Sequence, residues 1–202
     1  GAALERDAAL MGARVTISIQ IPEIWTVRDS QITALDTIAL VRSRVYAGKD
    51  TNDRSFKGYS KRPIWISYRA NLPPKGGEAT PQGVFYKGGY REYKQKSRRY
   101  TPGGKNQTAE VDLTLSGALM NNLITTNATK TSYTIGLSSK VQSYGYDVNR
   151  DRPFIGLSPS DQRKLTNAIA ARMRKKLSPI GYGYAEQKSV IASINRAIGG
   201  RK

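Results

Sequence analysis

Apolar and polar residues alternate over residues 15–20, where Val15, Ile17 and Ile19 occupy every second position. A period of two is typical of a strand with one buried face. Pro22 would end such a strand. We therefore expect a half-buried strand near the start of the chain.

The apolar spacing becomes helical from Pro22 or Ser30 to Ala47, and Gly48 is the expected terminator. Acidic residues lie early in this segment and basic residues lie late, which favours the helix dipole. We therefore predict a long helix. The side chains expected on its apolar face are Ile32, Leu35, Ala39 and Val45, broadened by Ile38, Leu40 and Val41.

Two further alternating segments follow. Ala109–Leu115 alternates through Val111, Leu113 and Leu115 and predicts a strand, after which Ser116 is a plausible N-cap for a short helical run over 117–123. Residues 131–137 alternate again and predict a second strand. Residues 140–148 either pair with that strand or form a loop, so two or three strands are expected here.

A capping box predicts the last long helix. Ser158 supplies a hydroxyl, Pro159 stands at the first helical position, and Asp161 can reach back to the cap. Apolar residues then recur every four positions at Leu165, Ile169, Met173 and Leu177. These elements indicate a single α+β domain over residues 1–202. We expect a small antiparallel or mixed sheet packed by a long N-terminal helix and a C-terminal amphipathic helix.

Composition limits the possible chemistry. The 202 residues include no Cys and no His, which excludes thiol and imidazole catalysis and Cys/His zinc sites. The pairs Asp147/Asp151 and Asp50/Asp53 could meet, but they lie in loop-like sequence, so turn residues and local salt bridges are the favoured interpretation. We expect no enzyme activity and no catalytic, metal or cofactor residues. A carboxylate-metal nuclease, the remaining enzyme class, would lose Mg²⁺-dependent activity when Asp147 or Asp151 is changed.

The formal charge of +18 indicates a polyanionic neighbour, with nucleic acid the commonest. An excess of +12 lies in residues 41–105, which are also rich in Gly, Pro and Tyr. We therefore expect 49–108 to be a basic extended arm or loop insertion, and 178–202 to be a C-terminal extension. No stretch reaches the roughly 18 to 20 apolar residues that a membrane span needs, so we expect a soluble protein without a membrane partner.

Aromatic and cationic residues interleave over 85–100. This composition suits base stacking with cations on phosphates, and it equally suits packing against a neighbouring subunit. The second interpretation is favoured because no RRM, OB or KH pattern surrounds the segment. The residues assigned to a subunit interface or a DNA-channel arm are Tyr86, Tyr90, Arg91, Tyr93, Lys94, Lys96, Arg98, Arg99 and Tyr100.

Two motifs lie in the second half of the chain. The first comprises Val111, Asp112, Leu113, Thr114, Leu115, Ser116 and Gly117, with Leu119 and Met120 after it. The second comprises Arg152, Pro153, Phe154, Ile155, Gly156, Leu157 and Ser158. These motifs and the order of elements resemble tailed-bacteriophage virion morphogenesis proteins, the family of tail-completion and head–tail joining (neck) proteins. The resemblance covers roughly residues 15 to 177. The chain departs from the pattern in a longer basic insertion over 72–104 and an added segment after residue 177.

The resemblance implies a structural component of the virion neck, assembled in the host bacterial cytoplasm. Such a protein forms a homo-oligomeric ring, of six or twelve subunits, between portal or adaptor and tail proteins. The packaged double-stranded DNA inside the ring would be contacted without sequence specificity. The alternative from another class is a basic nucleic-acid-binding module, such as an RNA-binding protein of a ribonucleoprotein particle. A free binder of that kind would bind polynucleotide as a monomer with a steep salt dependence.

Overall fold

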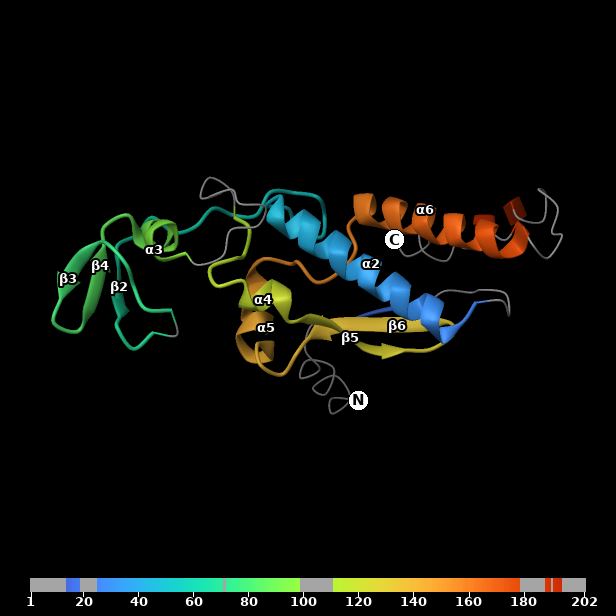
Figure 1. Ribbon diagram of the computed structural model, residues 1–202. Coiled ribbons are helices and arrows are strands. Elements are labelled where there is room, and N and C mark those ends of the chain that lie inside the picture. Colours follow the sequence, from blue (N-terminus) through green and yellow to red (C-terminus); the bar gives the residue numbers. More distant parts are fainter. Residues whose placement is uncertain are drawn as a thin grey trace, which may run out of the picture.

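A three-stranded antiparallel sheet packed by two long helices forms the core of the protein (Figure 1). The computed structural model describes residues 14–18, 25–70, 72–98, 111–178, 188–189 and 191–193. The sheet has the order β1-β6-β5, with β1 at Val15–Ser18, β6 at Ser132–Leu137 and β5 at Leu123–Ala128. Helix α2 (Val27–Tyr46) packs on β5 and β6, and helix α6 (Pro159–Leu177) packs on α2. The predicted α+β class with a small sheet and these two helices is therefore confirmed.

The register of the sheet places alternate residues on the two faces. Val15 pairs with Ile135, and Ile17 pairs with Tyr133. Tyr133 and Ile135 are buried under the helices, whereas Thr16 is exposed and its hydroxyl bonds to the Thr134 hydroxyl at 2.9 Å. The strands predicted at 15–20 and 131–137 are confirmed over their described residues, and residues 19–20 lie outside them.

Helix α2 is present as predicted, but it begins at Val27 rather than at Pro22 or Ser30, and its buried face is shifted from the predicted one. A capping box between Thr26 and Asp29 starts it. Of the residues expected on the buried face, Ile32 and Leu35 are 37% and 61% exposed and Ala39 is exposed as well. Thr33 and Thr37 are fully buried instead. The two threonine hydroxyls fit there because they donate to helix carbonyls one turn earlier. Satisfied hydroxyls thus take positions that apolar residues were expected to occupy.

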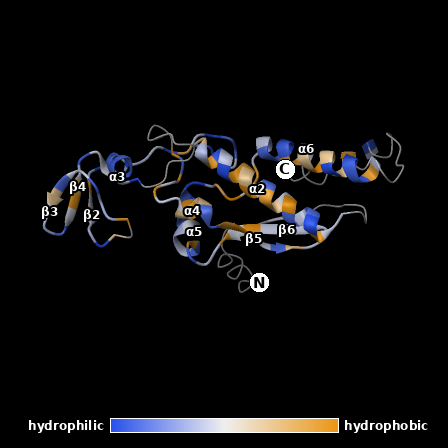
Figure 2. Cartoon of the chain, in the orientation of Figure 1, coloured by the Kyte–Doolittle hydropathy of each residue, from blue (hydrophilic) through white to orange (hydrophobic). Residues whose placement is uncertain are grey.

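Helix α6 confirms the predicted capping box. The Ser158 hydroxyl accepts from the Asp161 backbone N–H, and the Asp161 carboxylate accepts from the Ser158 N–H. The helix runs antiparallel to α2, because the Lys176 ammonium reaches Asp29 at 2.6 Å and the Arg172 guanidinium bonds to Asp36. Figure 2 shows hydrophilic and apolar residues alternating along α6, as an amphipathic helix requires. The four apolar residues predicted for its buried face are all buried.

The strand predicted at Ala109–Leu115 is wrong for its described residues. Residues 111–115 form an irregular segment in which Leu113 has a positive φ of 50°. The alternation has another cause: Val111 packs in the core, and Asp112 turns inward to meet two cations. Ala109 and Glu110 lie outside the described residues.

Of the two other predictions in this region, the short helical run is confirmed and the strand or loop at 140–148 is wrong. The short run becomes α4 (Ala118–Asn121), but its N-cap is Gly117, with φ 81°, and not Ser116. Residues 140–148, expected to be strand or loop, lie mostly in α5 (Gln142–Asp151). A Cβ at Gly145 would lie 2.2 Å from Leu137, so the absent side chain lets α5 approach the end of β6.

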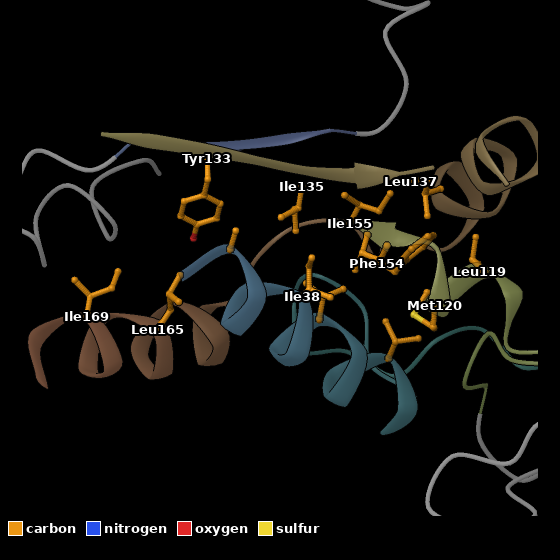
Figure 3. Packing of buried hydrophobic residues seen from close by; sticks show 14 of the residues in the cluster. Ile38, Leu119, Met120, Tyr133, Ile135, Leu137, Phe154, Ile155, Leu165 and Ile169 are labelled. Atoms are coloured by element: carbon orange, nitrogen blue, oxygen red, sulfur yellow. The ribbon is translucent and has the colours of Figure 1, made fainter. Parts of the chain in front are cut away.

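One hydrophobic core joins the sheet to both helices. Figure 3 shows Tyr133 and Ile135 of β6 directed at the helices that carry Ile38, Leu165 and Ile169, whereas Leu137 lies near Ile155 and Leu119. The turn before α6 adds Phe154, which is fully buried. The core therefore draws on the chain both before residue 60 and after residue 110.

A second, smaller sheet lies in segment 49–108 and projects beyond the core (Figure 1). Its order is β2-β4-β3, with β2 at Ile64–Ser67, β4 at Gly83–Tyr86 and β3 at Glu78–Thr80. Helix α3 (Gly89–Ser97) follows β4. We call residues 64–98 the lobe. The lobe corrects the prediction of an extended arm, since Val84, Tyr86 and Tyr93 form a small core of its own. The segment's high Gly and Pro content serves its short turns.

Candidate functional site

Two of the tyrosines predicted to face a partner are structural residues of the lobe. Tyr86 and Tyr93 are 0% and 4% exposed, and their rings pack edge to face with centroids 5.4 Å apart. The Tyr86 hydroxyl donates to the Lys75 carbonyl, and the Tyr93 hydroxyl donates to the Leu72 carbonyl. Tyr90 is only half-buried and stacks edge-on against Tyr93 at 5.8 Å. Of these three rings, only Tyr90 keeps substantial surface for a partner.

The predicted cations Lys94 and Arg98 lie inside the protein. Both bind the carboxylate of Asp112, and all three side chains are at most 2% exposed. Lys94 also donates to the Tyr59 hydroxyl, and Arg98 donates to the Thr114 hydroxyl at 2.6 Å. We call Lys94, Arg98 and Asp112 the ion cluster. It joins α3 of the lobe to the segment that follows residue 110, so these two cations are not available to DNA in this arrangement.

Burial and charge shift the protonation of the ion cluster. Burial lowers the pKa of Lys94 to about 8, although the carboxylate of Asp112 acts in the opposite direction. Burial alone would raise the pKa of Asp112, but the hydrogen bond and charge of Lys94 outweigh it and the pKa is lowered. Burial also raises the pKa of Tyr59. The carboxylate is therefore charged, while the ammonium is the group poised to lose its proton above neutral pH.

The remaining predicted residues differ in exposure and in whether they form an ion pair. Arg91 is exposed, and its backbone N–H donates to the Ser60 carbonyl at 3.1 Å. Lys96 is exposed but pairs with Glu92 at 2.6 Å. Arg99 and Tyr100 lie outside the described residues. Arg91 is therefore the cation of the predicted set that is exposed and forms no ion pair within the part of the chain that the structure describes.

An open groove of about 770 Å³ lies where the lobe meets the core. Four tyrosines line it, two from α3 and one each from residues 57–62 and α5, together with aliphatic residues of 113–119. Lys140 and Arg152 are its charged residues. We call it the tyrosine groove; its aromatic members are Tyr59, Tyr90, Tyr93 and Tyr144. A surface of aromatic and aliphatic side chains with a cationic rim is typical of protein interfaces.

A second hollow of about 990 Å³ shares Tyr59, Ser60 and Arg152 with the groove. Its character is different because most of its remaining lining is charged. We call it the cationic hollow; its charged residues are Lys57, Lys61, Arg62, Arg152 and Asp151. Sequence reasoning placed basic residues here only as part of a long arm. No motif marked residues 57–62 as distinct from the rest of that segment.

The paired carboxylates considered for catalysis have structural roles. Asp147 and Asp151 both bind Arg150, at 3.1 and 3.2 Å, on the exposed side of α5. Asp53 accepts from the Ser160 hydroxyl at 2.6 Å and from its backbone N–H. Within the part of the chain that the structure describes, no three acidic side chains gather into a possible metal site.

Residues of the two resemblance motifs hold key positions of the fold. Asp112 is the centre of the ion cluster, and Ser158 caps α6. The turn that the second motif forms before α6 is fixed by Arg44 of α2, which donates to the carbonyls of Phe154 and Gly156 at 2.6 and 3.0 Å. No sequence pattern pointed to Arg44, since basic residues late in a helix are ordinary. Asp112 stands between apolar residues of the first motif, and this position could have indicated a buried carboxylate with cationic partners.

None of the described helices is long and apolar enough to cross a membrane. Comparison with family models, with curated proteins and with solved structures finds no match to this chain.

Proposed function

We propose that this chain is a structural subunit of a tailed-phage neck, a head–tail connector or tail-completion protein without enzyme activity. It forms a homo-oligomeric ring, of six or twelve copies, between portal or adaptor and tail proteins and around the packaged DNA. The observation that carries the proposal is the lobe, which projects from the core and leaves the tyrosine groove open at its base. A projecting element beside an apolar groove suits a subunit that contacts neighbours on two sides.

The ion cluster supports this proposal in a second way. It bonds α3 to residues 112 and 114 next to the groove, since Arg98 contacts both Asp112 and Thr114. A buried network with several hydrogen bonds fixes one orientation of the joined parts. A lobe with a fixed orientation allows identical contacts to repeat around a closed ring. The two motifs that resemble those of neck proteins lie at this network and at the start of α6.

Imaging of the purified full chain tests the proposal. We expect rings in negative-stain images at high protein concentration, and mass photometry should give the subunit number. Tyr144 lines the tyrosine groove and is 44% exposed, so Tyr144→Asp should prevent ring formation while the circular dichroism spectrum stays unchanged. Tyr68→Asp is the matched control, because Tyr68 is 46% exposed on the lobe outside the groove. A chain that stays monomeric at every concentration would contradict the proposal.

The cationic hollow favours one second candidate, a nucleic-acid-binding module that acts as a monomer. The two functions differ in what the purified chain does alone. A binding module would hold polynucleotide tightly, with a steep salt dependence, and would form no rings. Rings in the absence of nucleic acid would support the neck protein instead.

A further inference from the structure

The cationic hollow concentrates positive charge on a concave surface. Lys57, Lys61 and Arg62 are exposed there, and Arg152 is half-buried at the base. The Arg152 guanidinium donates from two nitrogens to the Lys57 carbonyl, both at 3.4 Å. These bonds connect the end of α5 to residues 57–62. The one acidic residue of the lining, Asp151, already pairs with Arg150. Four cations therefore face solvent with little opposing charge among the described residues.

Packing against α3 holds the loop at 60–62 in place. Gly89, with φ 70°, starts α3 so close to the loop that a Cβ would lie 2.3 Å from the Arg62 carbonyl oxygen. The Ser60 carbonyl accepts from the Arg91 N–H, and the Ser60 hydroxyl accepts from the Arg62 N–H at 3.1 Å. The exposed side chain of Arg91 thus begins next to the same loop. The cations are arranged before any ligand arrives, which lowers the entropy cost of binding an anion.

Among the described residues, the one aromatic ring that lines the hollow is already surrounded by other side chains. Tyr59 is its aromatic residue, and the Lys94 ammonium lies 4.2 Å from the centre of that ring. The Arg152 guanidinium lies 5.7 Å from the same ring centre, and the Tyr90 ring lies 5.3 Å away. Single-stranded nucleic acids are bound through such stacking, whereas a duplex is held through its phosphates. The ligand that fits is therefore an array of phosphates with its bases turned away.

We propose that the cationic hollow binds the phosphate backbone of double-stranded DNA without reading its sequence. This deepens the proposed function, since it rests on DNA being the polyanion inside the ring, and it assigns the contact to Lys57, Lys61, Arg62 and Arg152. Arg91 extends the surface along α3. Lys94 and Arg98, which the sequence predicted to face DNA, are paired with Asp112 instead. The cations of the hollow are the ones left to contact DNA.

The exposed cations of α6 form the other surface that could bind phosphates. Arg163, Lys164, Arg174 and Lys175 are exposed and have no ion pair among the described residues. They are spread along a convex helix and line neither of the two hollows. A concave surface concentrates the field of its charges more than a convex one does. The hollow is therefore the stronger phosphate site, and α6 supplies a control with the same charge.

Fluorescence anisotropy on the full chain tests the inference with a labelled duplex of about 20 base pairs, between about 50 and 200 mM NaCl. The test variant is Lys57→Gln/Lys61→Gln/Arg62→Gln. The control, Arg163→Gln/Lys164→Gln/Arg174→Gln, removes the same charge from α6. Each lost phosphate contact should lower the slope of log K against log salt by about 0.9. The test variant should therefore lose about 2 to 3 units of slope and bind at least about tenfold more weakly, while the control stays close to wild type.

Lys57→Gln alone provides a milder variant, with an expected slope loss of about 0.9. Wild-type affinity in the test variant would overturn the inference, and so would an equal loss in the α6 control. Tighter binding of a single-stranded oligothymidine than of the duplex would overturn it as well. The outcome is distinct from that for the neck proposal: rings without duplex binding contradict only the inference, and duplex binding at the hollow without rings contradicts only the neck proposal.

Discussion

Lys94 of α3 and Asp112 of the segment after residue 110 form an ion pair whose side chains are 1% and 0% exposed. The pair joins the projecting lobe to the core-forming part of the chain. Removing one member of a buried pair leaves the other charge without compensation, which costs about 3 to 5 kcal/mol. The stability of the lobe's attachment should therefore depend on Asp112 more than on any surface charge.

Asp112→Asn should lower the free energy of unfolding by about 3 kcal/mol or more, because it leaves Lys94 and Arg98 buried without a counter-charge. Urea denaturation monitored by circular dichroism gives the value. Asp147→Asn removes the same charge from an exposed pair with Arg150 and should change stability little. Equal effects of the two changes would show that the ion cluster is not a structural element.

The free energy of unfolding should rise as the pH goes from about 8 towards 10. Burial lowers the pKa of Lys94 to about 8, from 10.5, so in this interval the unfolded state binds more protons than the folded state. Below pH 8 the lysine is charged in both states and the contribution is absent. Burial raises the pKa of Tyr133 to about 12, so stability should fall again above pH 10.

Lys94→Met isolates the lysine's part of this pH profile. The variant keeps Asp112 paired with Arg98 and fills a similar volume. Its unfolding free energy should lack the rise between pH 8 and 10 but keep the fall above pH 10. Denaturation at a series of pH values in both proteins gives the comparison, and an unchanged rise in the variant would assign it to other groups.

Arg44→Lys should destabilise the protein by about 3 kcal/mol even though the charge is retained. Arg44 reaches the carbonyls of Phe154 and Gly156 and the carboxylate of Asp161 with one planar guanidinium, and an ammonium cannot match that geometry. Thermal and urea unfolding measure the loss. Arg42→Lys on the same helix, at a half-buried position, is the comparison and should cost less.

Leu113→Asp should be tolerated far better than Leu123→Asp. The sequence placed Leu113 inside a strand, where a charge would unfold the core, but the residue is only partly buried and lines the tyrosine groove. Leu123 on β5 is 2% exposed. Burial of a carboxylate there without a partner costs several kcal/mol. Soluble yield and melting temperature of the two variants distinguish the positions.

Ser158→Ala should lower stability by about 1 kcal/mol through loss of the cap on α6. The hydroxyl accepts from the Asp161 N–H at 3.2 Å, and the residue is fully buried. Urea denaturation measures the change. Ser178→Ala, at the exposed other end of the same helix, should have almost no effect.

Local patterns predicted the parts of the fold that local interactions determine. The capping box at Ser158 and the four-residue spacing after it are sufficient to define α6, because cap and buried stripe lie within one segment. Strand β5 was not predicted because half of its six residues are Thr or Asn, and because a bulge between Thr125 and Asn127 breaks its alternation. Strand and helix cannot be distinguished by pattern where pairing with a distant strand decides the outcome.

Contacts between residues far apart in the sequence also explain why the ion cluster was not predicted. Lys94 and Arg98 look like surface cations until Asp112 is placed between them. The same holds for Thr37, whose hydroxyl meets the Tyr133 hydroxyl at 2.7 Å across a sequence separation of 96 residues. The α+β class could be predicted, whereas the division of cations between the buried ion cluster and the exposed hollow could not.

The ion cluster also has a mechanical consequence for the subunit. Asp112 bonds to Lys94 and Arg98, while its neighbour Val111 packs in the core. A force applied to the lobe therefore reaches the core through two adjacent residues, and pulling the lobe away would require the separation of buried opposite charges.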